Sequence, residues 1–167
     1  MKKLILTFLL VFLFSTVSLA ADYHIGIVTG TVSQSEDDLR GAQQMIAEYG
    51  DTSEDGMITH ITYPDYFMQE METTISQIVG LADDPKMKAI VVNQAVPGTV
   101  EAFRRIRERR PDIILLMGSP HEDPIMCADV ADLSVTPDNV ARGYLIIKAA
   151  QKLGADTFMH ISFPRHM

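Results

Sequence analysis

The chain has 167 residues, of which 47% are hydrophobic and 22% charged, and acidic side chains outnumber basic ones by 22 to 14. This composition excludes a disordered or low-complexity chain, and the length favours a single domain. The single cysteine excludes an internal disulfide scaffold, and the net charge of −8 argues against nucleic-acid binding, which depends on lysine and arginine.

The first twenty residues have the pattern of a secretory signal peptide. Met1-Lys2-Lys3 is positively charged, residues 4–14 are almost purely apolar, and Ser18-Leu19-Ala20 places small residues before a cleavage site. The apolar run is shorter than the roughly 20 residues of a membrane-spanning helix, so cleavage is favoured over an uncleaved anchor. We therefore expect a soluble periplasmic or extracellular protein. Its charge is −10, because losing Lys2 and Lys3 leaves 12 basic against 22 acidic residues.

The rest of the chain predicts alternating strands and helices, with short apolar runs for strands and apolar residues at helical spacing for helices. Strands are expected at residues 23–29, 57–63, 89–92, 113–117, 130–135 and 157–162. Helices are expected at residues 35–49, at 64–82, after Pro97 and at 137–153, with residues 118–124 forming a loop. Ser35 and Asp38 form a capping-box-like start for the first helix.

This order predicts an α/β fold: a three-layer, doubly wound parallel sheet with helices on both faces. The second strand carries His60 between polar neighbours and is expected at an edge, which favours the strand order 2-1-3-4-5-6. Residues 21–162 are expected to form a single lobe. Gly143 in the last helix is expected to pack closely against the sheet.

A ligand site is expected at the carboxyl ends of the strands, near the topological switch point. Four loops rich in hydroxyls and amides follow the strands there, and these groups both donate and accept hydrogen bonds. The candidate ligand-binding residues are Thr31, Ser33, Gln34, Asn93, Gln94, Ser119, His121, Thr136 and Asp138. The alternative for each single residue is a turn or a helix cap, as for Thr136 and Asp138.

No catalytic, metal-binding or cofactor-binding residues are predicted. Ser119, His121 and Asp123 lie within five residues, whereas the members of a catalytic triad come from separate segments. The five histidines show no metal-ligand spacing, and the glycine-rich nucleotide-binding motifs are missing from the sequence. Cys127 is interpreted as a small buried apolar residue, with a thiol that pairs with another molecule as the alternative.

Five arginines follow one another at the end of the helix after Pro97: Arg104, Arg105, Arg107, Arg109 and Arg110. Cations at a helix C-terminus complement the helix dipole, so a solvated helix end is the simplest interpretation. A docking patch for a membrane partner is the alternative.

Two stretches resemble the N-terminal lobe of type 1 periplasmic binding proteins. They are the opening strand and loop at residues 23–30 and the segment 136–144, in which Asp138-Asn139 precedes Gly143. The ending at residues 159–167 is similar to a little-characterised bacterial family with that fold.

The resemblance implies a two-lobed clamshell that captures a small polar solute and passes it to the permease of an ABC-type importer. This chain is then expected to hold one lobe, with residues 163–167 starting the hinge crossing to a second lobe that it lacks. The predicted function is solute binding without catalysis. The alternatives are an extracytoplasmic enzyme with a flavodoxin-like or hydrolase-like sheet, and a module that docks on a membrane sensor through the arginine-rich helix end.

Overall fold

A computed structural model describes residues 21–161, so the expected signal peptide and the expected hinge at residues 163–167 lie outside the described part. Its strands are β1 (His24–Thr29), β2 (Ile58–Thr62), β3 (Met87–Asn93), β4 (Ile114–Gly118) and β5 (Leu133–Val135). Its α-helices are α2 (Val32–Tyr49), α3 (Met71–Leu81), α4 (Thr99–Arg109), α5 (Pro124–Val130) and α6 (Asn139–Lys152). Within residues 21–161, no helix is both long and apolar enough to cross a membrane.

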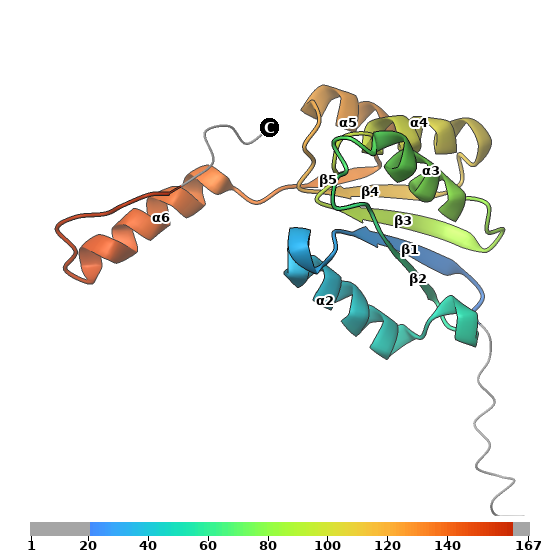
Figure 1. The fold of residues 1–167 in the computed structure, drawn as a ribbon, viewed down its shortest axis with the longest axis horizontal. Helices are drawn as coiled ribbons and strands as arrows, with labels where there is room; N and C mark the ends of the chain where they lie inside the picture. The colour runs from blue at the N-terminus through green and yellow to red at the C-terminus, as the bar shows by residue number, and fades with distance from the viewer. Residues whose placement is uncertain (1–20, 162–167) are drawn as a thin grey trace, which may run out of the picture.

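The five strands form an all-parallel sheet in the order β2-β1-β3-β4-β5, as the alternating pattern predicts. Helix α2 covers one face, and α3, α4 and α5 cover the other (Figure 1). The half-polar β2 lies at an edge, where only Ile58 of its residues is fully buried. The predicted α/β class and doubly wound topology are therefore confirmed.

The two faces of the sheet carry cores of very different size. The larger core lies under α3, α4 and α5 and includes the fully buried side chains of Ile78, Ile90 and Phe103. Among residues 21–161, the smaller core, under α2, has Ile27, Ala42 and Ile58 as its buried members. Helix α2 thus protects β1 and β2 while leaving much of that face of β4 and β5 exposed.

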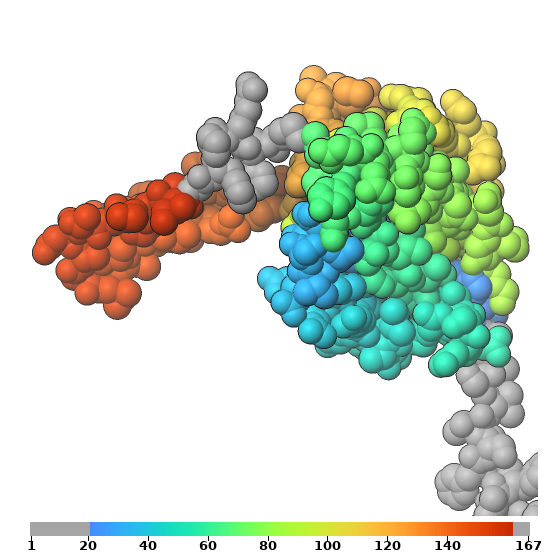
Figure 2. All heavy atoms as spheres, viewed as in Figure 1, coloured from blue at the N-terminus to red at the C-terminus, as the bar shows by residue number. Residues whose placement is uncertain are grey.

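The last part of the chain departs from the prediction. No residue of α6 is buried, and the helix extends away from the sheet (Figure 1). In Figure 2 its atoms stand outside the rounded body formed by the other elements. The predicted packing of Gly143 on the sheet is wrong, because nothing lies within 4 Å of the position that its Cβ would take.

The predicted sixth strand at residues 157–162 is also wrong over the part that is described. Residues 157–161 have no regular structure, and Ser162 lies outside the described residues. Helix α6 leads this segment away from the sheet edge, so it has no neighbouring strand with which to pair. The observed sheet therefore ends at β5.

Helix boundaries differ from the prediction at three places. Helix α5 lies between the expected loop at residues 118–124 and the expected strand at 130–135, where no helix was predicted. Asp123 caps its start by accepting hydrogen bonds from the N–H groups of Ile125 and Met126. Helix α3 begins at Met71, because the residues after Pro64 form turns. Helix α2 begins at Val32 but is kinked at Ser35, whose φ of −158° is not helical.

Candidate functional site

A cavity of about 510 Å³ opens at the carboxyl ends of β3 and β4, next to the start of α2 and the start of α6. This is the edge of a parallel sheet at which ligands generally bind. The lining residues are Ser35, Asp37, Asp38, Asn93, Gln94, Gly118, Ser119, Pro120, His121, Thr136, Pro137, Asn139 and Arg142. The topology and the strand-end loops therefore locate the cavity correctly.

Five of the nine sequence-predicted residues line this cavity, and they come from three different loops. Asn93 and Gln94 follow β3, Ser119 and His121 follow β4, and Thr136 follows β5. They lie up to 43 positions apart in the sequence, and the parallel sheet brings them to one edge.

The other four predicted residues lie outside the cavity lining. Thr31 and Ser33 donate hydroxyl hydrogen bonds to the Asp65 carboxylate, and the Gln34 amide donates to the Asp65 carbonyl oxygen. These two hydroxyl bonds lower the pKa of Asp65. The three side chains therefore fasten the start of α2 to the loop after β2.

Asp138 has a structural role at the start of α6. Its side-chain Oδ1 accepts a hydrogen bond of 2.8 Å from the Ala141 N–H, which caps the helix. This matches the capping alternative that the sequence left open for Asp138.

Two lining residues have a backbone conformation that is uncommon for residues other than glycine. Gln94 has a φ of 46° and Ser119 a φ of 44°, and each directly follows a strand. Such left-handed residues persist only where the surrounding structure holds them in place, and they concentrate at functional sites. Both strand ends that open into the cavity therefore carry a strained residue.

Backbone hydrogen bonds hold the loops of the cavity rim together. The N–H of Ala95 donates to the carbonyl of Gly118 at 2.9 Å, and the N–H of His121 donates to the carbonyl of Ala95 at 2.9 Å. The N–H of Ser119 donates to the carbonyl of Val135 at 2.7 Å. The ends of β3, β4 and β5 thus form one connected frame, which positions their side chains before any ligand arrives.

The two amide side chains of the rim are in different situations. Gln94 donates from Nε2 to Ser35 Oγ at 3.2 Å, and Ser35 in turn donates to the Asp38 carboxylate at 2.5 Å. Asn93 makes no side-chain hydrogen bond within residues 21–161. Its amide lies against Gly118, where a Cβ would be only 2.8 Å from Asn93 Oδ1. Asn93 is therefore available to bind a ligand, whereas Gln94 supports the wall.

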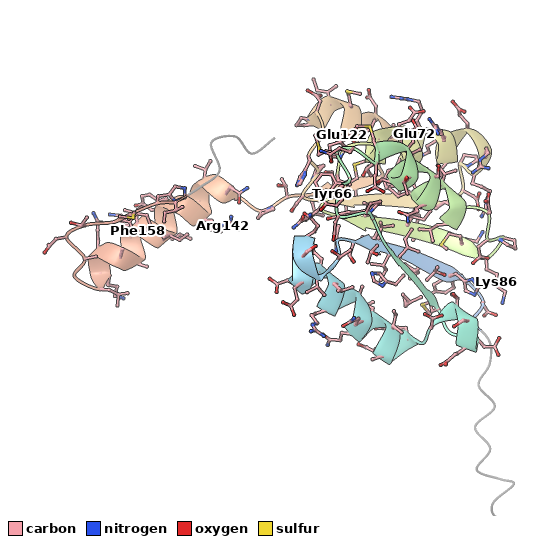
Figure 3. All side chains as sticks on the ribbon, viewed as in Figure 1. Tyr66, Glu72, Lys86, Glu122, Arg142 and Phe158 are labelled. Atoms are coloured by element: carbon pink, nitrogen blue, oxygen red, sulfur yellow. The ribbon has the colours of Figure 1, made fainter. Side chains whose placement is uncertain are left out.

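Charged residues from two helices add to the lining. Asp37 and Asp38 belong to α2, while Arg142 lies on α6 near the end that joins the sheet (Figure 3). The sequence analysis missed these residues because they lie inside helices and not in the strand-end loops. The available signal was their position within the first two turns of helices that start at this edge of the sheet.

Cys127 is 1% exposed and belongs to the larger core. Burial raises the pKa of its thiol, which disfavours the reactive thiolate. The interpretation of Cys127 as a small buried apolar residue is confirmed. Among the residues that the structure describes, no three His, Cys, Asp or Glu side chains are grouped in a way that could hold a metal ion.

The four arginines of α4, and Arg110 directly after it, all pair with acidic residues. Arg104 and Arg105 contact Glu101, and the further pairs are Arg105–Glu72, Arg107–Asp132, Arg109–Asp83 and Arg110–Asp112. Arg110 also donates to the backbone carbonyls of Ala82, Asp84 and Met87. These contacts fasten the end of α4 to α3 and to the strands.

Comparisons with known proteins give two uncharacterized bacterial relatives and a solved structure with a similar fold. An uncharacterized protein of Treponema pallidum (strain Nichols) is 45% identical over 148 residues, which cover 87% of this chain and 67% of that protein. A second uncharacterized protein of that strain is 46% identical over 90 residues, covering 54% of this chain and 42% of its own length.

A similar solved structure is that of a "Putative transcriptional regulator from Clostridium difficile 630", with a TM-score of 0.71 and 25% identity. The match covers 86% of this chain and 41% of that one, so this chain spans less than half of the solved protein. Residues 23–167 match the family described as "Protein of unknown function (DUF3798)". The chain belongs to the DUF3798 family.

Proposed function

We propose that this chain is a lobe of an extracytoplasmic solute-binding protein that captures a small polar molecule for an ABC-type importer. The observation that carries the proposal is the cavity of about 510 Å³ at the carboxyl ends of the strands. Its size suits a small molecule. Its rim presents hydroxyls and amides on a frame of backbone hydrogen bonds, and the Asn93 amide is free to bind.

Two sequence features support an extracytoplasmic binding role. Residues 1–20 have the order of charge, apolar run and small residues that directs export. Residues 23–30 and 136–144 resemble the N-terminal lobe of type 1 periplasmic binding proteins, and the second stretch supplies the cavity residues Thr136, Asn139 and Arg142. The proposed partners are a small solute and a membrane permease, and the proposed location is the periplasm or the extracellular space.

Ligand sensing is a second candidate, favoured by the Clostridium difficile neighbour, which is named a transcriptional regulator. Sensing and import both need the cavity to bind a solute. They differ in the partner protein that recognises the solute-bound form. Enzymatic function has weaker support, because Cys127 is buried with a raised thiol pKa. A nucleophile would therefore have to come from the rim, where Ser119 is the candidate.

The proposal is tested by screening purified residues 21–167 against sugars, nucleosides, vitamins and amino acids by thermal shift, then by calorimetry. We expect one class to raise the melting temperature of the wild type and of Gln69→Ala, an exposed amide outside the cavity. The same solute should stabilise Asn93→Ala much less. Equal stabilisation of all three proteins, or no stabilising solute in the screen, would contradict the proposal, and chemical turnover of the solute would favour the enzyme alternative.

A further inference from the structure

We propose that the cavity takes a zwitterionic solute, whose ammonium group binds Asp37 and Asp38 on α2 and whose carboxylate binds Arg142 on α6. A free amino acid and a short peptide both carry this pair of charges. The assignment rests on the proposed function, because it names the class of small polar solute that the cavity captures. It applies to import and to sensing alike.

Charges of opposite sign line the same cavity. Asp37 and Asp38 come from the first turns of α2, and Arg142 comes from the first turn of α6. The remaining lining residues are glycine, proline, histidine and residues with hydroxyl or amide side chains. An exposed charge in water needs no partner, so an aspartate or an arginine alone would indicate nothing here. Together they give a solute an anionic and a cationic contact in one cavity.

Arg142 differs from the other arginines of the described chain. Within residues 21–161, the six others form ion pairs with aspartate or glutamate. Arg142 forms none in that range, and no carboxylate oxygen of Asp37 or Asp38 lies within 4.0 Å of its guanidinium nitrogens. The charges of the cavity therefore do not pair with one another, and a bound solute can supply their partners.

A series of hydrogen bonds that starts in the core holds Asp38 in place. The hydroxyl of the fully buried Tyr63 donates to Gln94 Oε1 at 3.5 Å. The Gln94 amide donates to Ser35 Oγ at 3.2 Å, and Ser35 donates to Asp38 Oδ2 at 2.5 Å. Asp38 Oδ1 accepts no hydrogen bond within residues 21–161. One oxygen of a fixed carboxylate is thus free for an ammonium group, which donates up to three hydrogen bonds.

Singly charged solutes match the cavity less well. An anion would meet two carboxylates and one guanidinium, so repulsion outweighs attraction. A cation would cover Arg142 without pairing it, and an unpaired charge shielded from water is costly. A zwitterion gives both signs of charge a partner, while the hydroxyls and amides of the rim bind its neutral polar groups.

The first measurement adds matched analogues to the solute screen. The standard amino acids and alanyl-alanine are the zwitterionic probes, and calorimetry compares the best of them with its N-acetyl form and its amide. The N-acetyl form lacks the cation and the amide lacks the anion, so each should bind roughly 10-fold or more weakly. Equal binding of either analogue would overturn the proposal.

The class of the best solute separates this proposal from the proposed function. A sugar or nucleoside that binds while no zwitterion does would overturn the zwitterion and leave solute binding intact. The absence of any stabilising solute would contradict solute binding itself, and the zwitterion with it.

Two variants test the two contacts separately. Arg142→Gln and Asp38→Asn should each bind the best zwitterion roughly 10-fold or more weakly than the wild type. Lys152→Gln on α6 and Glu36→Gln on α2 are the matched controls, because each removes a charge of the same sign from the same helix outside the cavity. Both controls should keep Kd within about twofold of the wild type.

A selectivity measurement separates a contact from a merely structural role. Because Arg142 is assigned to the carboxylate, Arg142→Gln should bind the zwitterion and its amide about equally, whereas Asp38→Asn should still prefer the zwitterion. Arg142 is exposed on a helix with no buried residue, so its variant keeps the fold of the lobe. Wild-type affinity in Arg142→Gln, an unchanged preference in that variant, or equal losses in the controls would refute the assignment.

Discussion

The substitution Gly118→Ala is expected to weaken solute binding while leaving the lobe folded. A Cβ on Gly118 would lie 2.8 Å from Asn93 Oδ1, and ordinary van der Waals contact begins at 3.4 Å. The Asn93 amide must therefore move by at least about 0.6 Å. This amide is the end of a short side chain and makes no hydrogen bond within residues 21–161, so it can move without disturbing the sheet.

The size of the effect follows from the hydrogen bonds at stake. A neutral hydrogen bond contributes about 0.5–1.5 kcal/mol net, so each bond that Asn93 loses to the solute weakens Kd roughly 2- to 13-fold. The free energy of unfolding should change by less than about 1 kcal/mol, because alanine is intrinsically better than glycine within a strand. Binding and stability are thus expected to separate.

Calorimetry with a solute that stabilises the wild type, combined with urea denaturation, measures both quantities. Gly80→Ala in α3 is the matched control, since nothing lies within 4 Å of the position of its Cβ. We expect Gly80→Ala to keep the wild-type affinity and to gain up to about 1 kcal/mol of stability. A folded Gly118→Ala protein with the wild-type Kd would refute the role assigned to Asn93.

Three further predictions concern the body of the lobe. Phe103→Ala should lower the free energy of unfolding by about 3–5 kcal/mol, because Phe103 is fully buried. Phe158→Ala, at a position that is 45% exposed, should change it by less than about 1 kcal/mol. Similar losses for the two variants in urea denaturation would contradict the assigned core. Burial raises the pKa of Tyr63 to about 12, so the free energy of unfolding should be insensitive to this group below pH 10. It should then fall by up to about 1.4 kcal/mol per pH unit between pH 10 and 12, a slope that Tyr63→Phe should remove. Cys127 should react with a thiol reagent only as fast as the chain unfolds, and rapid labelling of the native protein would contradict its burial.

The sheet could be predicted because its strands differ in polarity. The apolar run of β4 and the half-polar run of β2 indicate a central and an edge position, and the alternation with helices requires parallel pairing. The packing of α6 could not be predicted in this way. Helical spacing of apolar residues shows that a helix needs a partner, but it does not identify the surface that the partner provides. Helix α5 was missed because its seven residues are too few for a periodic pattern.

Cavity residues could be predicted where the sheet topology alone determines their position. They could not be predicted where their position depends on contacts between side chains that are distant in the sequence. Asn93 and Ser119 could be assigned because parallel strands bring their ends to one edge. Thr31 and Ser33 donate hydrogen bonds to Asp65 and do not line the cavity. Asp65 lies more than 30 positions away in the sequence, so no local pattern indicates this contact. Arg142 was missed for the same reason, because its place in the cavity follows from the direction in which α6 leaves β5.

The most direct test of solute binding at the strand ends is an NMR titration of residues 21–167 with the solute that gives the largest thermal shift. We predict that the backbone amide signals of Asn93, Gln94 and Ser119 move and that those of His24 and Lys88, at the opposite end of the sheet, stay in place. Signal changes confined to the opposite end of the sheet, or no change at saturating solute, would contradict the account.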